Sequence, residues 1–259
     1  MFKDFFDGMG SYGKAWYIIS KHNLWYYVIV PGVISVILGG SIAYAAYLLH
    51  PDFSFFLTEL YPSSWWGYSI FESIASFFGG LILVVTGILT YRNLLIGFLS
   101  PFMSPLAARV QEIETGRVVY DPPFFSFTNL RLILRGLYFG LRNLVKELWY
   151  TGWLFLLGLI PVFGLAIPIL IFLVQSFYAG FGNLDYTLEK FYDVKGSKRF
   201  SQKHRWLAVG NGTIFLLLLG VPVLGLFFAP ALSTVAATLE AVKRVDTPLR
   251  TQQQLEEYI

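Results

Sequence analysis

Three polar residues stand directly before the first long apolar stretch of the chain, where they are placed to bind an anion. Lys21, His22 and Asn23 precede an uncharged run that begins at Leu24. If that run is a helix, the free N–H groups of its first turn and the positive end of its dipole attract anions. The same residues are typical of an interfacial anchor, in which Lys21 reaches toward lipid headgroups beside an aromatic belt. Both interpretations stay open.

A short pattern containing proline and glycine occurs twice and is the second candidate for function. Residues 160–165 read IPVFGL, residues 221–226 read VPVLGL, and another proline follows each copy. Because proline removes a helical hydrogen bond, such a break at membrane depth must be buried in protein or line a wet cavity. A returning helix would point its positive end at the midplane and favour an anion there, although simple turn formation is the alternative. The pore-lining candidates of the two copies are Pro161, Gly164, Pro168, Pro222, Gly225 and Pro230.

Uncharged polar side chains lie within the apolar stretches themselves. Asn211 and Thr213 are placed to coordinate a permeant ion, as are Gln175 and Ser176 in the preceding stretch. Interhelical hydrogen bonding is the more frequent use of such residues in membrane proteins. Asn211 and Thr213 are therefore pore-lining candidates beside a structural interpretation. Asp185, directly after the first of these stretches, is expected to pair with a nearby arginine.

Several chemistries have no candidate residues in the sequence. The chain contains no cysteine, and its three histidines lie in separate segments, so no metal site is predicted. Paired acids, a serine with an activating histidine and a phosphate-binding glycine loop are not recognisable, so we expect no catalytic residue and no cofactor. The net charge of +3 is too small to predict a nucleic-acid surface. The sequence favours a protein that is not an enzyme.

The composition identifies the elements that position these candidates as membrane helices. Of 259 residues, 56% are hydrophobic and 14% are charged, whereas soluble domains carry about 25% charged residues. The uncharged stretches 24–49 and 73–91 are long enough to cross a hydrocarbon core of about 30 Å. Residues 1–21 mix aromatic and charged side chains, which predicts an amphipathic helix on the membrane surface.

Charge placement predicts that the repeated patterns turn hairpins and do not belong to full crossings. The segments 109–147 and 190–205 are both basic, so the positive-inside bias places both in the cytoplasm. The apolar stretch between them must enter the membrane and return, and its first arm covers only about 20 Å as a helix. We therefore expect half-penetrating hairpins at 148–184 and 206–239. Both termini are expected inside, with 240–259 as a polar tail.

Four blocks of the sequence share their order and spacing with a known group of membrane proteins. The blocks are Leu24–Pro31, then Pro101-Phe102 with Leu106-Ala107 and Arg109-Val110, then the two hairpin tips, and then Asp185-Tyr186. In these blocks the chain resembles the CysZ family of bacterial inner-membrane sulfate permeases, which shares a domain with eukaryotic etoposide-induced-2.4-like proteins. The resemblance implies two long transmembrane helices, two pairs of half-penetrating helices and cytoplasmic termini. It also implies a homo-oligomer that takes up sulfate.

One turn departs from the pattern of that family. The family's sulfate site resembles a Pro-Gly-Leu-Arg-Arg turn, whereas the matching residues 22–26 here read HNLWY and contain neither arginine. At the hairpin tips, Gly164 and Gly225 stand where the family often has asparagine. The anion-binding candidates that remain at the turn are Lys21, His22, Asn23, Leu24 and Trp25.

These observations predict an all-α integral membrane protein with a single membrane domain over residues 1–259. It combines two long transmembrane helices, two re-entrant helical hairpins tipped by Pro and Gly, and an N-terminal amphipathic helix. The preferred functional hypothesis is an inner-membrane transporter or channel for sulfate or a similar inorganic oxyanion, with the lipid bilayer and the anion as partners and no nucleic acid. The alternative is a non-transporting membrane scaffold or partner-binding protein of the same domain family.

Overall fold

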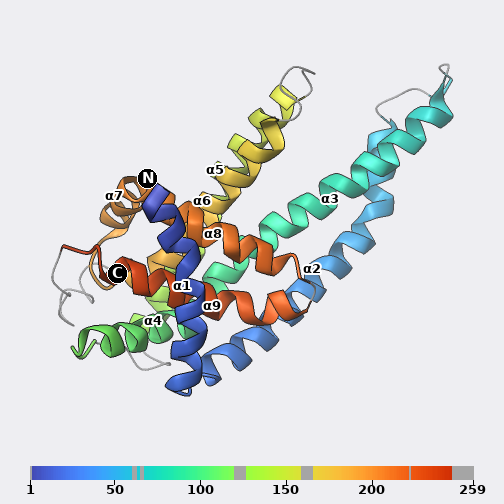
Figure 1. Ribbon diagram of the computed structural model, residues 1–259. Coiled ribbons are helices and arrows are strands. Elements are labelled where there is room, and N and C mark those ends of the chain that lie inside the picture. Colours follow the sequence, from blue (N-terminus) through green and yellow to red (C-terminus); the bar gives the residue numbers. More distant parts are fainter. Residues whose placement is uncertain are drawn as a thin grey trace. The chain divides into compact units, whose positions relative to one another are not determined.

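The all-helical architecture predicted from the sequence is confirmed. The computed structural model describes residues 2–59, 63–64, 67–119, 127–158, 166–221 and 223–246, and these residues form helices and turns without a strand (Figure 1). Within these ranges, the helices are α1 (Phe2–Lys21), α2 (Tyr26–Glu59), α3 (Tyr68–Phe98), α4 (Ser100–Thr115), α5 (Phe127–Gly158), α6 (Ala166–Leu188), α7 (Val194–Lys203), α8 (Arg205–Leu219) and α9 (Leu224–Val242).

Four helices of the described chain are long and apolar enough to cross a membrane. They are α2, the Tyr68–Tyr91 part of α3, α6 and α9. α2 contains residues 26–49 of the first predicted span, and α3 contains all of the second, 73–91; both helices continue into polar flanks. The last two are the returning arms of the predicted hairpins and qualify by length and composition. How deeply those two hairpins enter the membrane stays a prediction.

Residues Val36–Arg92 form a compact unit of their own, made of the later part of α2 and most of α3. Gly79 of α3 lies beside Leu57 of α2, and Gly87 lies beside Ile42. Because residue numbers rise on one helix as they fall on the other, the two segments run antiparallel. Glycine on α3 lets the two helices approach closely, as in other membrane helix pairs.

In the other unit, which holds the rest of the chain, α8 packs against α6, α1 and α9. A β-carbon on Gly212 of α8 would lie 1.8 Å from the Ser176 carbonyl oxygen of α6. One on Gly210 would lie 2.1 Å from the Phe5 carbonyl oxygen of α1. The Gly210-Asn211-Gly212 sequence is therefore a packing motif, in which glycine brings the backbones of three helices together.

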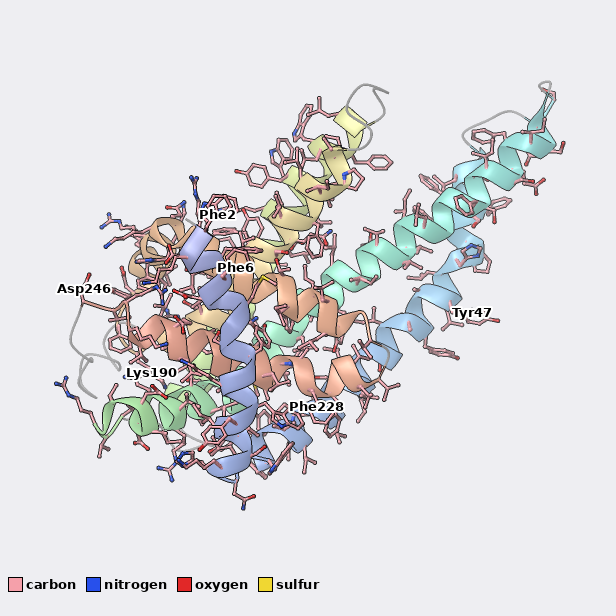
Figure 2. All side chains as sticks on the ribbon, in the orientation of Figure 1. Phe2, Phe6, Tyr47, Lys190, Phe228 and Asp246 are labelled. Atoms are coloured by element: carbon pink, nitrogen blue, oxygen red, sulfur yellow. The ribbon has the colours of Figure 1, made fainter. Side chains whose placement is uncertain are left out.

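α1 forms the expected amphipathic helix. Gly8, Ala15 and Ile19 are buried on the face that packs against α8 and α9. Phe2 and Phe6 are 73% and 63% exposed (Figure 2). The helix thus has one face for the bundle and an aromatic face that remains open. Its position on the membrane surface stays a prediction.

α5 begins well before the predicted first arm of the first hairpin. The apolar stretch from Leu148 is the later part of one continuous helix that starts at Phe127. The basic segment 109–147 therefore includes a long helical portion. Arg142 and Lys146 belong to the same helix as the apolar arm, which fixes their positions relative to it.

α8 and α9 cover the second predicted hairpin and pack against each other. The Gly225 amide donates to the Val221 carbonyl oxygen at 2.8 Å, and the Phe227 amide donates to that of Val223 at 3.0 Å. Val223 has a φ of 61°, which is rare for a β-branched residue. α8 has 15 residues and so measures about 22 Å, less than the thickness of a hydrocarbon core. This length favours a re-entrant hairpin.

Ion pairs fasten the N-terminal helix to the end of α9. The Arg244 guanidinium lies 2.6 Å from the Asp7 carboxylate and 2.5 Å from that of Glu240. α9 continues to Val242, so the first residues of the predicted polar tail 240–259 are helical and paired. The described segments near the two ends of the chain therefore lie on the same side of this unit.

Candidate anion site

Four side chains of decreasing polarity lie in a row on one face of α5. Arg142, Lys146, Tyr150 and Leu154 follow one another at intervals of four residues. Residues at this spacing lie one above another on a helix. The row therefore passes from two cations through a phenol to an aliphatic side chain.

α7 supplies a third cation and a side-chain amide. The Asp193 carboxylate caps this helix by accepting a hydrogen bond from the Gly196 amide at 2.7 Å. Lys198 and Gln202 lie four residues apart and so share one face of α7. Both side chains line the same cavity as the cations of α5.

Arg142, Lys146 and Lys198 surround a cavity of about 130 Å³, which we call the basic cavity. Two tyrosine hydroxyls and two side-chain amides add polar groups, and none of the lining residues is a carboxylate. Cations and N–H or O–H donors are the groups that hold an oxyanion in proteins. The basic cavity therefore has the composition of an anion site. Its lining residues are Arg142, Asn143, Lys146, Tyr150, Phe177, Tyr178, Phe181, Lys198 and Gln202.

The charge of the basic cavity is not neutralised at its lysines. Among the described residues, no carboxylate forms an ion pair with Lys146 or Lys198. Desolvation by burial lowers the pKa of the Lys146 ammonium, and the charges of Arg142 and Lys198 lower it further. An anion between these like charges would stabilise the charged form of Lys146.

Asn143 adds a buried donor to the basic cavity. Its side chain is 1% exposed, and its amide oxygen accepts a hydrogen bond from the Arg142 guanidinium at 3.3 Å. Its amide nitrogen has no hydrogen-bond partner within the described part of the chain. Buried donors are normally satisfied, so this N–H group is suited to a ligand in the cavity.

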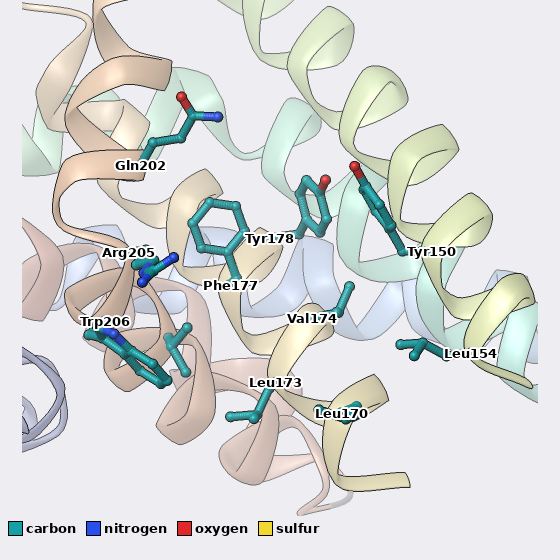
Figure 3. A pocket seen from close by; sticks show the side chains of 11 residues that line it. Tyr150, Leu154, Leu170, Leu173, Val174, Phe177, Tyr178, Gln202, Arg205 and Trp206 are labelled. Atoms are coloured by element: carbon teal, nitrogen blue, oxygen red, sulfur yellow. The ribbon is translucent and has the colours of Figure 1, made fainter. Parts of the chain in front are cut away.

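A larger and mainly apolar cavity of about 820 Å³ adjoins the basic cavity, and we call it the apolar groove. Tyr150, Phe177, Tyr178 and Gln202 line both cavities. In Figure 3 the two tyrosine hydroxyls point toward the end of the groove at which Gln202 lies. The leucine side chains lie toward the opposite end. The other residues of the apolar groove are Leu154, Leu170, Leu173, Val174, Arg205, Trp206 and Val209.

The side chains of the turn between α1 and α2 line neither cavity. Lys21 and His22 are exposed, and the Lys21 ammonium lies 5.4 Å from the centre of the Tyr17 ring. Trp25 packs edge to face against Trp16, with ring centres 5.5 Å apart. This geometry supports the interfacial-anchor interpretation of the turn.

The backbone of that turn is engaged in ending α1. Asn23 has a φ of 54°, a left-handed conformation that asparagine tolerates better than most residues. The Leu24 amide donates to the Ile19 carbonyl oxygen at 3.0 Å, and the Leu24 side chain is buried. The Leu24 N–H group thus serves the fold. Anion binding elsewhere at this turn stays a prediction.

The two polar pore-lining candidates on α8 are held in hydrogen bonds between helices. The Asn211 side chain accepts from the Asn183 amide at 3.0 Å and donates to the Ser233 carbonyl oxygen at 3.1 Å. The Thr213 hydroxyl lies 3.3 Å from that of Ser176. These contacts join α8 to α6 and α9, and they support the structural interpretation of both residues.

Two of the described tip residues, Gly225 and Pro230, have packing roles. Pro168 is exposed in the first turn of α6, and Pro230 is buried inside α9. A β-carbon on Gly225 would lie 1.8 Å from the Leu218 carbonyl oxygen, so close packing explains this glycine. Pore lining by the tips stays a prediction. The candidates that lie outside the described residues are Pro161, Gly164 and Pro222.

Asp185 pairs with an arginine, as expected from the sequence. Its carboxylate lies 3.4 Å from the Arg135 guanidinium, and both side chains are buried. Close by in the chain, the buried Glu189 carboxylate accepts a hydrogen bond from the Ser104 hydroxyl. Pairing of this kind is needed because an unpaired buried charge is strongly destabilising. These contacts connect α6 and its end to α4 and α5.

Sequence reasoning did not identify the basic cavity. The four-residue spacing of Arg142 and Lys146 is readable in the sequence, but both belong to a segment interpreted as a cytoplasmic basic loop. Lys198 is distant in sequence and reaches the cavity only because α7 packs near α5 and α6. The available signal was the continuation of the helical pattern across residue 147, since it places the cations on the apolar arm's own helix.

Comparison with known proteins gives one family match. The family model described as Sulfate transporter CysZ/Etoposide-induced protein 2.4 matches residues 11–230, a range that contains both cavities. No curated protein matches the chain. The match and the membrane-length helices together identify a multi-pass membrane protein.

Proposed function

The chain belongs to the sulfate transporter CysZ/etoposide-induced protein 2.4 family, and from this we propose that it carries sulfate or a similar inorganic oxyanion across a bacterial inner membrane. We further propose that the anion is held in the basic cavity. The turn at residues 22–26 lacks the arginines of the related sulfate site, so a different cluster of cations must supply the charge. The basic cavity is such a cluster within the described chain.

One observation carries this assignment: three cations line a small cavity in which no lining residue is acidic. Sulfate has two negative charges and only acceptor oxygens. It therefore needs positive charge and donors, and a carboxylate in the lining would oppose it. The volume of about 130 Å³ suits a small ion, since sites for organic ligands measure about 300–1,000 Å³.

The positive-inside bias predicts where along the transport path the proposed site lies. With the basic segments in the cytoplasm, the basic cavity lies at the cytoplasmic base of the first hairpin. The row on α5 then leads from Arg142 at that base toward Leu154 nearer the tip. The site would therefore receive or release the anion on the cytoplasmic side. We propose that the protein acts as a homo-oligomer, as in the resembling family.

A second candidate function is a non-transporting membrane scaffold. The specific observation that favours it is the absence of both arginines at residues 22–26. In that case the basic cavity would bind an anion without passing it on. Transport and scaffolding differ in flux, which makes them separable by one measurement.

Uptake of labelled sulfate into liposomes that contain the purified protein tests the proposed function. We expect uptake above that of empty liposomes, and excess unlabelled sulfate should reduce the labelled signal by competition. A matched sample containing heat-denatured protein controls for leaky vesicles. Uptake equal to that of empty liposomes would favour the scaffold.

A further inference from the structure

The apolar groove is too large and too apolar to serve an inorganic ion. Its volume of about 820 Å³ falls within the range of about 300–1,000 Å³ that is typical of sites for organic ligands. Tyr150 and Leu170 on its walls are 51% and 44% exposed, so the groove opens to the surface of the helices. In a membrane protein that surface faces acyl chains. An apolar segment of a lipid is the matching occupant.

The groove changes from polar to apolar along its length. Gln202 and the hydroxyls of Tyr150 and Tyr178 lie toward one end, whereas Leu170 and Leu173 lie toward the other (Figure 3). This order follows α6, on which the leucines are nearer the hairpin tip. A phospholipid has the same order, from a polar headgroup to apolar chains.

Two donors on α8, the Arg205 guanidinium and the Trp206 indole, stand on one wall of the groove. Within the described chain, the exposed Arg205 guanidinium has no carboxylate partner. The neighbouring Trp206 indole N–H is buried and has no hydrogen-bond partner there either. Arginine and N–H groups bind phosphate oxygens well. This wall therefore favours a lipid whose headgroup is a phosphate with net negative charge.

We propose that the apolar groove binds one anionic phospholipid, with its phosphate at Arg205, Trp206 and Gln202 and an acyl chain along Leu170 and Leu173. Basic pockets between membrane helices bind anionic headgroups by the same electrostatics. A zwitterionic lipid has the same chains, but its own ammonium opposes the guanidinium. The lipid site does not depend on sulfate transport, because the inorganic anion is assigned to Arg142, Lys146 and Lys198.

Native mass spectrometry of the full chain in a non-ionic detergent tests this site. Phosphatidylglycerol and phosphatidylcholine with identical acyl chains are titrated separately. We expect the first phosphatidylglycerol to bind about fivefold more tightly, since one basic residue near a membrane surface contributes about 1 kcal/mol. Arg205→Gln should abolish that preference, whereas Arg199→Gln, an exposed arginine outside the groove, should preserve it. Equal binding of the two lipids by the wild-type protein would overturn the proposal.

A second pair of variants tests the acyl-chain part. Leu173→Asn should weaken binding of both lipids and keep the headgroup preference, whereas Leu141→Asn on the exposed face of α5 should change neither. A parallel competition experiment with inorganic phosphate distinguishes binding of a free anion from binding of a lipid headgroup. If inorganic phosphate displaces phosphatidylglycerol from the wild type and Leu173→Asn has no effect, the groove takes a free anion and the lipid proposal is wrong. Sulfate uptake is measured separately and does not enter this result.

Discussion

At the residue scale, the proposed anion site depends on the environment of Lys146. Burial first, and then the charges of Arg142 and Lys198, lower the pKa of its ammonium group. A bound anion has the opposite effect, because it stabilises the charged form. The affinity for sulfate should therefore be highest at a pH well below the lowered pKa of Lys146. It should fall as the pH rises through that pKa.

We therefore expect the affinity for sulfate to depend on pH, and a single substitution should remove this dependence. As the pH rises from about 7 toward the ordinary lysine pKa of about 10.4, the wild-type affinity for sulfate should decline. The decline should approach tenfold, since a hydrogen bond to a charged group contributes about 1.5–3 kcal/mol. Lys146→Arg should keep the affinity nearly constant because arginine remains charged. Equilibrium binding of labelled sulfate to the purified wild type and to Lys146→Arg measures the two affinities at each pH.

Lys195→Arg is the matched control for that substitution. Lys195 is exposed on α7 and lines neither cavity, so its replacement should leave the pH profile of the wild type unchanged. A wild-type affinity that stays constant over the same pH range would contradict the role of Lys146.

The residues of the site were only partly predictable from the sequence. Lys21 and its neighbours are candidates from the sequence for anion binding or for an interfacial anchor, because a helix start with an adjacent cation is a local signal. The structure shows Lys21 exposed and places the basic cavity around Lys146 and Lys198. Cations that meet across two helices leave no local spacing to read. Asp185 was easier to interpret, because a charge next to an apolar stretch needs a partner.

At the element scale, the close contact of α6 and α8 gives a prediction about stability. Gly212→Ala would place a methyl group 1.8 Å from the Ser176 carbonyl oxygen, so the helices must separate. Overpacking of this kind costs about 1–3 kcal/mol or more, and thermal unfolding in detergent should show a lower midpoint. Gly152→Ala on α5 meets no atom within 4 Å and should be neutral or stabilising by up to about 1 kcal/mol. Equal midpoints would contradict the packing role of Gly212.

The contact between α1 and α9 gives a second prediction at this scale. Arg244→Gln leaves the carboxylates of Asp7 and Glu240 without their shared guanidinium. Hydrogen exchange of the α1 amides should accelerate. The free energy that protects α1 from opening should fall by about 1.5–3 kcal/mol, the contribution of charged hydrogen bonds. Lys243→Gln removes a more exposed cation from the same Glu240 and should have a smaller effect. Unchanged exchange in α1 after Arg244→Gln would show that the ion pairs do not hold this helix.

The elements themselves were largely readable, whereas their limits and contacts were not. Long uncharged stretches identify α2 and α3 because hydrocarbon tolerates few charges. The same criterion placed the start of the first hairpin at Leu148, although α5 begins at Phe127, because the first part of that helix is polar on one face. The role of Gly212 was hidden, since a glycine in a helix gives no sign of which backbone it touches.

At the scale of the whole molecule, the absence of cysteine allows a direct test of orientation. Single-cysteine variants Ser63→Cys, Glu114→Cys and Lys195→Cys place one exposed thiol in the turn before α3, on α4 and on α7. We expect a membrane-impermeant maleimide to label only Ser63→Cys from outside the cell, because the segments around the other two are basic and should be cytoplasmic. All three should react after the membrane is opened. External labelling of Lys195→Cys would contradict the proposed orientation.

The proposed oxyanion transport through the basic cavity is tested most directly by sulfate uptake into liposomes containing matched variants. Removal of two cations in Lys146→Gln with Lys198→Gln should lower uptake by about tenfold or more, since each charged hydrogen bond contributes about 1.5–3 kcal/mol. Lys195→Gln with Arg199→Gln removes the same charge from exposed positions on α7 and should retain the wild-type rate. Equal uptake by the two double variants, both above empty liposomes, would contradict the assignment of the anion to the basic cavity.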